Sequence, residues 1–398
     1  MSPSSEPQVL ADVHRGTVLA AQFSSVGPDL RFAYLPDFAG RPLAHTLPVG
    51  MSVDRPGRTL PPFFTNLLPE GRRLSALQRA LKTSGDDELG LLLAVGEDTV
   101  GDVRVVPAGH TPERVEPAVP SGTPLDFAQL ASRAGIDRVA VPGVQDKLSA
   151  GMITLPLPRG RRAGVDQPDA SGASLVKLTP PDYPGAVENE HFALGLATRL
   201  GERVVRHELV RDVHGTPGLV VVRFDRVPEP VAVEDACQLL GRYPSDKYLV
   251  TAEEVAAVVA DVVAAPAVAR RSIHRQFVFA WLMGNGDLHA KNVSVVRLPT
   301  GEWRVAPIYD TVCTLAWGDT TMALSMGGRV EGFVRRHLVD FGRSIGLPER
   351  VAERDVDVAL AATSTVDADL EAGALPYDPT TVRRLRRQLG RRRRDALG

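Results

Sequence analysis

The most constraining feature of this chain is a polar stretch, GNGDLHAKN at residues 284–292, followed by PIYD at residues 307–310. It places Asp287 five residues before Asn292, with Asp310 a further 18 residues along the chain. Phosphoryl transfer requires such a set, because one carboxylate orients the attacking hydroxyl while an amide oxygen and a second carboxylate hold a metal ion. The alternative interpretation is a polar turn between two buried elements.

Protein kinases have the same Asp-x-x-x-x-Asn spacing in their catalytic loop. We therefore predict that Asp287 orients an acceptor hydroxyl, and that Asn292 and Asp310 bind Mg²⁺, an ion that prefers oxygen ligands. His289 and Lys291 lie between them and are candidates for contacts with the nucleotide. For His289, a structural role with its ring satisfied by a neighbouring carbonyl is an equal alternative.

A candidate phosphate loop, GVQDK at residues 143–147, lies upstream. Glycine permits the backbone N–H groups to approach phosphate closely, and a lysine can neutralise phosphate charge. A single glycine is also typical of a plain β-turn. The phosphate-loop interpretation is therefore supported only by the position of this segment in the order of motifs. The candidate nucleotide-binding residues here are Gly143, Val144, Gln145 and Lys147.

Lys177 is flanked by apolar residues near the end of a predicted strand at 174–178. In a kinase such a lysine pairs with the ATP phosphates and with a glutamate of the following helix. The helix predicted at 188–200 offers Glu188 and Glu190. The alternative for Lys177 is an edge-strand lysine that faces solvent.

A hinge between two lobes is expected around RFDR at residues 223–226 and EDACQ at residues 234–238, which opens a helical region. Backbone groups here could hold the adenine ring, and Glu234 and Gln238 are candidates for direct nucleotide contacts. Packing or helix capping is an equally good explanation of these two side chains.

A chain of 398 residues is too long for one compact core, so we expect two or three units. The predicted organisation is an α+β N-terminal subdomain at 8–106, a linker at 107–124, a kinase-like N-lobe at 125–235 and a helical C-lobe at 236–398. In the first unit, strands are expected at 9–13, 17–23, 31–34 and 100–106, and helices at 72–82 and 86–95. Later strands are expected at 152–157, 174–178, 204–213, 219–224, 293–298 and 303–307, and the chain is largely helical from residue 251.

Charge and cysteine content favour a cytoplasmic protein. We expect it to bind neither membranes nor nucleic acids in general. The net charge is −2, so no global field attracts an anionic surface. Cys237 and Cys313 form no C-x-x-C pair and are expected to be reduced thiols. The N-terminus lacks the apolar core of a signal peptide, and the most apolar run, 255–269, is interrupted and too short to span a bilayer.

Residues 383–394 include eight arginines in twelve positions. Such a segment could follow a phosphate backbone. The favoured interpretation is a last helix with a solvated basic face, in which Val382, Leu385 and Leu389 pack inward.

These motifs together resemble the HipA family of bacterial serine/threonine kinases, the toxin half of a toxin–antitoxin pair. FFTNLLPEG at residues 63–71 is similar to the signature of the family's N-terminal subdomain. The other motifs named above are similar to its phosphate loop, ATP lysine, hinge, catalytic loop and metal motif. The resemblance implies a two-lobed kinase-like α+β fold, with a small N-terminal subdomain and a mostly helical C-terminal lobe.

The resemblance also implies ATP- and Mg²⁺-dependent phosphorylation of a protein, such as an aminoacyl-tRNA synthetase, and a helix-turn-helix antitoxin of the HipB type as partner. Operator DNA would be bound only together with that antitoxin. One departure concerns control: members commonly carry a serine just before the phosphate loop, and its autophosphorylation inactivates the kinase. This chain has Ala140-Val141-Pro142, so we expect cis-inactivation at that point to be missing, with phosphate on Ser149 as the contrary outcome.

Two other functions compete with an active protein kinase. A catalytically weak regulatory subunit would keep the fold and act by binding an antitoxin and DNA, but the intact Lys177, Asp287, Asn292 and Asp310 argue against it. A small-molecule phosphotransferase would share the same chemistry, and the match across both lobes and the N-terminal subdomain argues against that.

Overall fold

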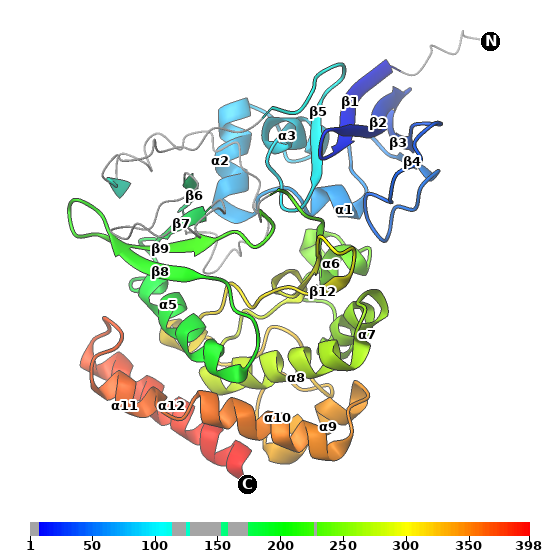
Figure 1. Ribbon diagram of the computed structural model, residues 1–398. Helices are drawn as coiled ribbons and strands as arrows, with labels where there is room; N and C mark the ends of the chain where they lie inside the picture. The colour runs from blue at the N-terminus through cyan, green and yellow to red at the C-terminus, as the bar shows by residue number, and fades with distance from the viewer. Residues whose placement is uncertain (1–7, 114–124, 128–152, 158–173, 227–228) are drawn as a thin grey trace.

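The computed structural model describes residues 8–113, 125–127, 153–157, 174–226 and 229–398. The N-terminal subdomain is an antiparallel sheet with its helices on one side, at the top of Figure 1. Its strands run in the order β4-β3-β2-β1-β5. The bounds are β1 Gln8–Arg15, β2 Val18–Val26, β3 Asp29–Tyr34, β4 Ser52–Arg55, β5 Val103–Pro107, α1 Pro62–Thr65, α2 Gly71–Leu81 and α3 Glu88–Val95.

An aromatic cluster connects this sheet to the FFTNLLPEG motif. Phe64 at the end of α1 lies with its ring centroid 4.9 Å from Phe23 on β2 and 5.2 Å from Phe32 on β3, and all three are buried. Aromatic pairs at such distances add to the stabilisation from burial alone. The first half of the motif is therefore core, and it fixes where the second half, residues 66–71, leaves the subdomain.

The N-lobe is a second antiparallel sheet, in the order β6-β7-β9-β8, with α5 packed against it. Leu194 and Val187 of α5 are buried against Leu219 and Val221 of β9. The bounds are β6 Ile153–Leu157, β7 Ser174–Leu178, α5 Ala186–Ala197, a 3-10 turn Thr198–Leu200, β8 His207–Arg211 and β9 Pro217–Val222. α5 and its 3-10 extension end at Gly201, in the left-handed region with φ 71°, which glycine adopts without strain.

The helical lobe contains the largest buried apolar cluster among the described residues and lies at the bottom of Figure 1. Helix α8 crosses its centre and contacts α7, α9, α10 and α12. The helices are α6 Ala236–Leu239, α7 Ala252–Val262, α8 Pro266–Met283, α9 Arg335–Ser344, α10 Glu349–Ala362, α11 Val366–Glu371 and α12 Pro379–Leu397. The strands β10 Val233–Asp235, β11 Ser294–Arg297 and β12 Trp303–Val305 form a small sheet, and 3-10 turns occupy Pro244–Asp246, Ala290–Asn292 and Thr314–Trp317.

The two-lobed α+β fold predicted from the sequence is confirmed, with local corrections. Glu234 and Asp235 were expected to open a helical region, but they form β10, which pairs with β11, and the helix begins at Ala236. Strand β4 and helix α1 were not predicted. Both are four residues long, too short to show a periodicity in the sequence.

The arginine-rich tail is helix α12, and its apolar face packs inward as predicted. Leu385 and Leu389 are buried, and Val382 packs against the same core. The guanidinium of Arg392 lies 3.7 Å from the ring centroid of Trp281 and donates to its carbonyl. At least one arginine of this helix, Arg392, therefore packs inside the helical lobe and does not face solvent. No helix in the described part of the chain is long and apolar enough to cross a membrane.

Candidate active site

The polar stretch 284–292 is a loop at the end of α8. Gly284 stops the helix with φ 69°, a conformation in which a side chain would also meet Leu315 at 2.3 Å. The Asn285 side chain then accepts a hydrogen bond from the Asp287 N–H at 2.8 Å, and the Gly286 N–H donates to Thr314 Oγ1 at 2.7 Å. These contacts fix the backbone that presents Asp287.

Asn292 is oriented by the same loop. Its Nδ2 donates to the Asp287 carbonyl at 2.8 Å, which leaves Oδ1 buried and without a hydrogen-bond partner among the described residues. A buried acceptor without a partner is costly unless a ligand satisfies it. An amide oxygen beside a carboxylate is a donor set that suits Mg²⁺, which completes its shell with water and phosphate oxygens.

Asp310 enters the site from the segment after β12, and three contacts place it. The Ile308 N–H donates to the Arg203 carbonyl at 2.8 Å, and the Tyr309 hydroxyl donates to the Lys291 carbonyl at 2.7 Å. The Asn189 side chain on α5 accepts from the Cys313 N–H at 2.7 Å. The segment with Asp310 is thus connected to the loop at 284–292 on one side and to helix α5 of the N-lobe on the other.

Lys177 on β7 joins the two lobes. Its ammonium lies 2.8 Å from Glu190 Oε1 on α5 and 2.8 Å from Asp310 Oδ1. Burial opposes the charged form of this lysine, but the carboxylates of Asp310 and Glu190 outweigh burial and raise the pKa of Lys177. Of the two helix glutamates that the sequence offered, Glu190 is the partner.

Asp287 is buried, at 4% exposure. Burial and the neighbouring Asp310 carboxylate raise the pKa of Asp287 well above its usual value, while the Lys247 ammonium opposes the shift. The Tyr248 hydroxyl donates to Asp287 Oδ1 at 3.3 Å. Neither Lys247 nor Tyr248 was predicted, and no local motif marks them, because they reach the loop from a separate turn before α7.

Four predicted nucleotide-binding residues have protein partners. Glu234 Oε1 lies 2.7 Å from His45 Nδ1, Gln238 caps α6 and donates to the Phe63 carbonyl, and the Lys291 ammonium bonds Asn66. His289 accepts from the Lys291 N–H through Nδ1, and its buried Nε2 has no hydrogen-bond partner among the described residues. A nucleotide role for these four stays a prediction.

Gly143, Val144, Gln145 and Lys147, together with Ala140, Pro142 and Ser149, lie outside the described residues. The structure therefore brings together Lys177, Asp287, Asn292 and Asp310 from the predicted set, in a buried region between the lobes. Glu190 is added to them by its pairing with Lys177.

Comparison with known proteins bears on the family and the fold. The family model described as HipA N-terminal domain matches residues 11–106, and that of the HipA-like C-terminal domain matches residues 139–366, more than half of the chain. A putative kinase of Sinorhizobium fredii is 32% identical over 319 residues, covering 72% of this chain and 73% of that protein. The serine/threonine-protein kinase toxin HipA of Shewanella oneidensis is 28% identical over 354 residues, covering 79% and 77%.

A solved structure of the Shewanella oneidensis HipA, HipB and operator DNA complex aligns with a TM-score of 0.73 at 22% identity. The alignment covers 98% of this chain and 97% of that one, so the fold extends over the N-terminal subdomain and both lobes. With both family models matched along the chain, the protein belongs to the HipA family.

Proposed function

We propose that this protein is an ATP- and Mg²⁺-dependent serine/threonine protein kinase. The observation that carries the proposal is the junction at Asp310, whose carboxylate meets Lys177 of the N-lobe. Beside it, the amide oxygen of Asn292 on the loop at 284–292 has no hydrogen-bond partner within the described part of the chain. Kinase chemistry depends on an intact lysine–glutamate pair and on metal ligands held in place, and the Lys177–Glu190 pair is formed.

In this proposal Mg-ATP, when bound, supplies the transferable phosphoryl group. Lys177 holds phosphate oxygens, and Asn292 and Asp310 hold the metal ion. Asp287 orients the serine or threonine hydroxyl and takes its proton as the new oxygen–phosphorus bond forms, while the bond from the γ-phosphorus to the bridging oxygen breaks and ADP leaves. The loop with Gly143, Val144, Gln145 and Lys147 is proposed to cover the phosphates with its backbone N–H groups.

The substrate and partners belong to the same proposal. We expect the acceptor to be a translation component such as an aminoacyl-tRNA synthetase, and the neutralising partner to be a HipB-like antitoxin that brings operator DNA with it. The antitoxin and operator DNA are supported by the name of the 28% identical relative, a kinase toxin, and by the composition of the structurally similar complex. The translation component is proposed from the family resemblance alone.

The test is transfer of labelled γ-phosphate from Mg-ATP into a bacterial lysate, with wild type beside Asp287→Ala. Wild type should label a discrete protein, and the variant should be slower by roughly 10²- to 10⁴-fold, the usual loss for a proton-transfer group. The labelled protein, once identified, names the substrate. Near-normal labelling by Asp287→Ala would show that Asp287 does not have this role. A wild type that binds ATP and labels no protein would contradict the protein-kinase proposal.

A further inference from the structure

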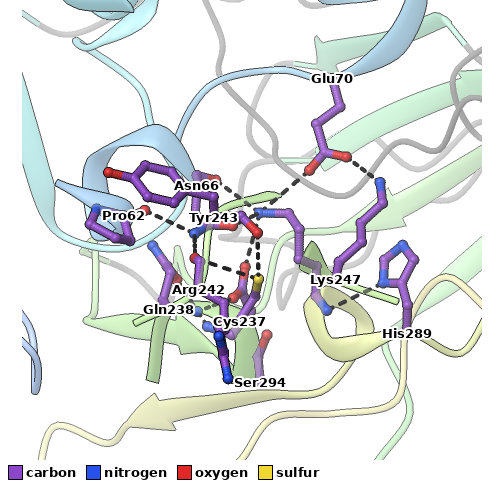
Figure 2. A network of polar contacts seen from close by, with 12 residues as sticks. Pro62, Asn66, Glu70, Cys237, Gln238, Arg242, Tyr243, Lys247, His289 and Ser294 are labelled. Atoms are coloured by element: carbon purple, nitrogen blue, oxygen red, sulfur yellow. Dashed lines mark hydrogen bonds and ion pairs between the residues drawn. The ribbon is translucent and has the colours of Figure 1, made fainter. Parts of the chain in front are cut away.

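The second half of the FFTNLLPEG motif has no role in the chemistry above, yet it faces the catalytic loop. Asn66 is fully buried, and its Nδ2 donates to the carbonyls of Pro62 and Arg242, both at 2.8 Å. The first bond is inside the N-terminal subdomain and the second reaches the helical lobe. Asn66 is therefore fixed at the boundary between the two units, as Figure 2 shows.

Lys291, the residue before Asn292, is turned into this boundary. Its ammonium donates to the Asn66 carbonyl at 3.1 Å, to Asn66 Oδ1 at 2.8 Å and to Asp235 Oδ2 at 3.1 Å. Glu70 Oε1 lies 3.5 Å away. The Lys291 side chain is completely buried, and a buried ammonium requires both hydrogen-bond acceptors and opposite charge. The N-terminal subdomain supplies two of these acceptors through Asn66 and one of the negative charges through Glu70.

Glu70 also holds the opposite side of the loop. Its Oε2 forms an ion pair with Lys247 (Figure 2). The Lys247 carbonyl in turn accepts from the Ala290 N–H at 3.2 Å. The next residue, Tyr248, is the one whose hydroxyl contacts Asp287. One carboxylate of the N-terminal subdomain is thus shared between Lys291, inside residues 287–292, and Lys247, which contacts that segment from outside. Residues 287–292 include the predicted base and a predicted metal ligand.

We propose that Asn66 and Glu70 are positioning residues, which hold the catalytic loop in register through Lys291 and Lys247. Neither side chain touches the groups proposed to react, so their effect is on the placement of Asp287 and Asn292. The N-terminal subdomain then completes the kinase site, which explains why a polar Asn and Glu follow the aromatic core residues of the motif. This inference rests on the proposed kinase function.

The test variant is Glu70→Gln, which keeps the size of the side chain and removes its charge. We expect the turnover number for phosphate transfer to fall roughly 10- to 100-fold, the scale of a misplacement of about 1 Å. The Kd for ATP without Mg²⁺ should stay within about twofold, because Lys177 and Glu190 have no contact with Glu70. Glu70→Asp keeps the charge and should recover part of the rate.

Tyr243→Phe is the matched control. It removes the Tyr243 hydroxyl bond to the Leu60 carbonyl, 3.3 Å long, at the same boundary and without contact to either lysine. Its turnover number should equal that of wild type. An equal loss in Tyr243→Phe and Glu70→Gln would mean that any loosening of the boundary lowers activity, and it would overturn the positioning role. An unchanged turnover number in Glu70→Gln would also overturn it.

Hydrogen exchange of the amides in residues 286–292 provides a readout that does not need activity. Exchange should become faster in Glu70→Gln and stay unchanged in Tyr243→Phe, in full-length protein that melts as one cooperative species. If wild type transfers no phosphate, the proposed function fails, and faster loop exchange in Glu70→Gln would still support the structural part of this inference. Unchanged exchange in this variant would overturn it, whether or not the protein is a kinase.

Discussion

At the scale of single residues, Asp310 has an uncommon backbone conformation at a position where its side chain also pairs with Lys177. Its φ is 51°, and Lys82 is the other non-glycine residue with positive φ in the described part of the chain. Asp tolerates this region better than most residues, but the conformation still has a cost. The surrounding contacts enforce it, because Tyr309 and Cys313 on both sides of Asp310 are hydrogen-bonded to other elements.

Asp310→Asn separates the role of charge at this position from the role of shape. Asn also tolerates a positive φ, so the segment should keep its conformation while the amide replaces a carboxylate ligand. We expect the affinity for ATP in the presence of Mg²⁺ to fall about 10- to 100-fold, equivalent to roughly 1.4–2.7 kcal/mol. Equilibrium titration with and without Mg²⁺ measures this, and Asp287→Ala should retain Mg²⁺-dependent binding. Equal affinities for wild type and Asp310→Asn would argue against a metal-binding role.

At the scale of elements, helices α8 and α10 are joined by an ion cluster around one buried carboxylate. Asp355 on α10 is fully buried and accepts hydrogen bonds from Arg271 and Arg275 of α8, both at 2.8 Å. Burial opposes ionisation of Asp355, but His274, with Nδ1 3.9 Å from Oδ2, and the hydrogen bonds from Arg271 and Arg275 outweigh burial and hold the pKa of Asp355 below its ordinary value of 3.8. A carboxylate with a lowered folded-state pKa stabilises the fold above pH 3.8, and this contribution is lost as the pH falls through the folded-state pKa.

We therefore expect Asp355→Asn to lower the free energy of unfolding at pH 7 by about 2 kcal/mol, less than the full cost of breaking a buried pair, because Arg275 still pairs with Glu202 and Arg271 is partly exposed. The difference from wild type should narrow as the pH falls below 3.8, where Asp355 becomes protonated in the unfolded chain, and should be lost as the pH passes through the lower folded-state pKa. Urea denaturation at several pH values measures both effects. Asp340→Asn, which affects an exposed pair with Arg343, should change stability by less than about 1 kcal/mol. A difference that stays constant down to pH 2 would contradict the assigned ionisation.

How far the sequence predicts these elements depends on the range of the contacts. The loop at 284–292 was identified because its chemistry is encoded within nine neighbouring residues, and the long strands and helices because their periodicity is local. Lys291 was interpreted as a nucleotide contact, whereas its ammonium bonds Asn66, 225 residues away in sequence. Similarly, the selection of Glu190 over Glu188 depends on how α5 packs against β9, a tertiary contact that no local pattern specifies.

At the scale of the whole molecule, the N-terminal subdomain is attached by a second buried cluster beside the predicted hinge. Arg223 and Arg226 both pair with Asp98 of the N-terminal subdomain, at 3.0 and 2.6 Å, and with Asp225 of their own segment. Asp225 in turn accepts from the Gly101 N–H at 3.0 Å. The hinge is thus held to the subdomain that also supplies Asn66 and Glu70, so docking and loop placement are coupled.

Asp98→Asn tests this coupling. The variant leaves two buried guanidinium groups with one carboxylate instead of two, and we expect the docked state to lose about 2 kcal/mol, less than the full cost of breaking a buried pair because Asp225 remains. Opening of the subdomain should then be roughly 30-fold more frequent. The measurement is limited proteolysis of the full chain, followed as the rate of cleavage between the two units.

Asp54→Asn is the control, because Asp54 pairs with Arg31 on the exposed side of the same subdomain and should leave the cleavage rate unchanged. Phosphate transfer by Asp98→Asn should keep nearly its full rate at low temperature, since a docked state favoured by several kcal/mol stays dominant after a 2 kcal/mol loss. On warming, its activity should fall earlier than that of wild type, together with the rise in cleavage. Loss of activity without faster cleavage would mean that Asp98 acts on the hinge itself and not on docking.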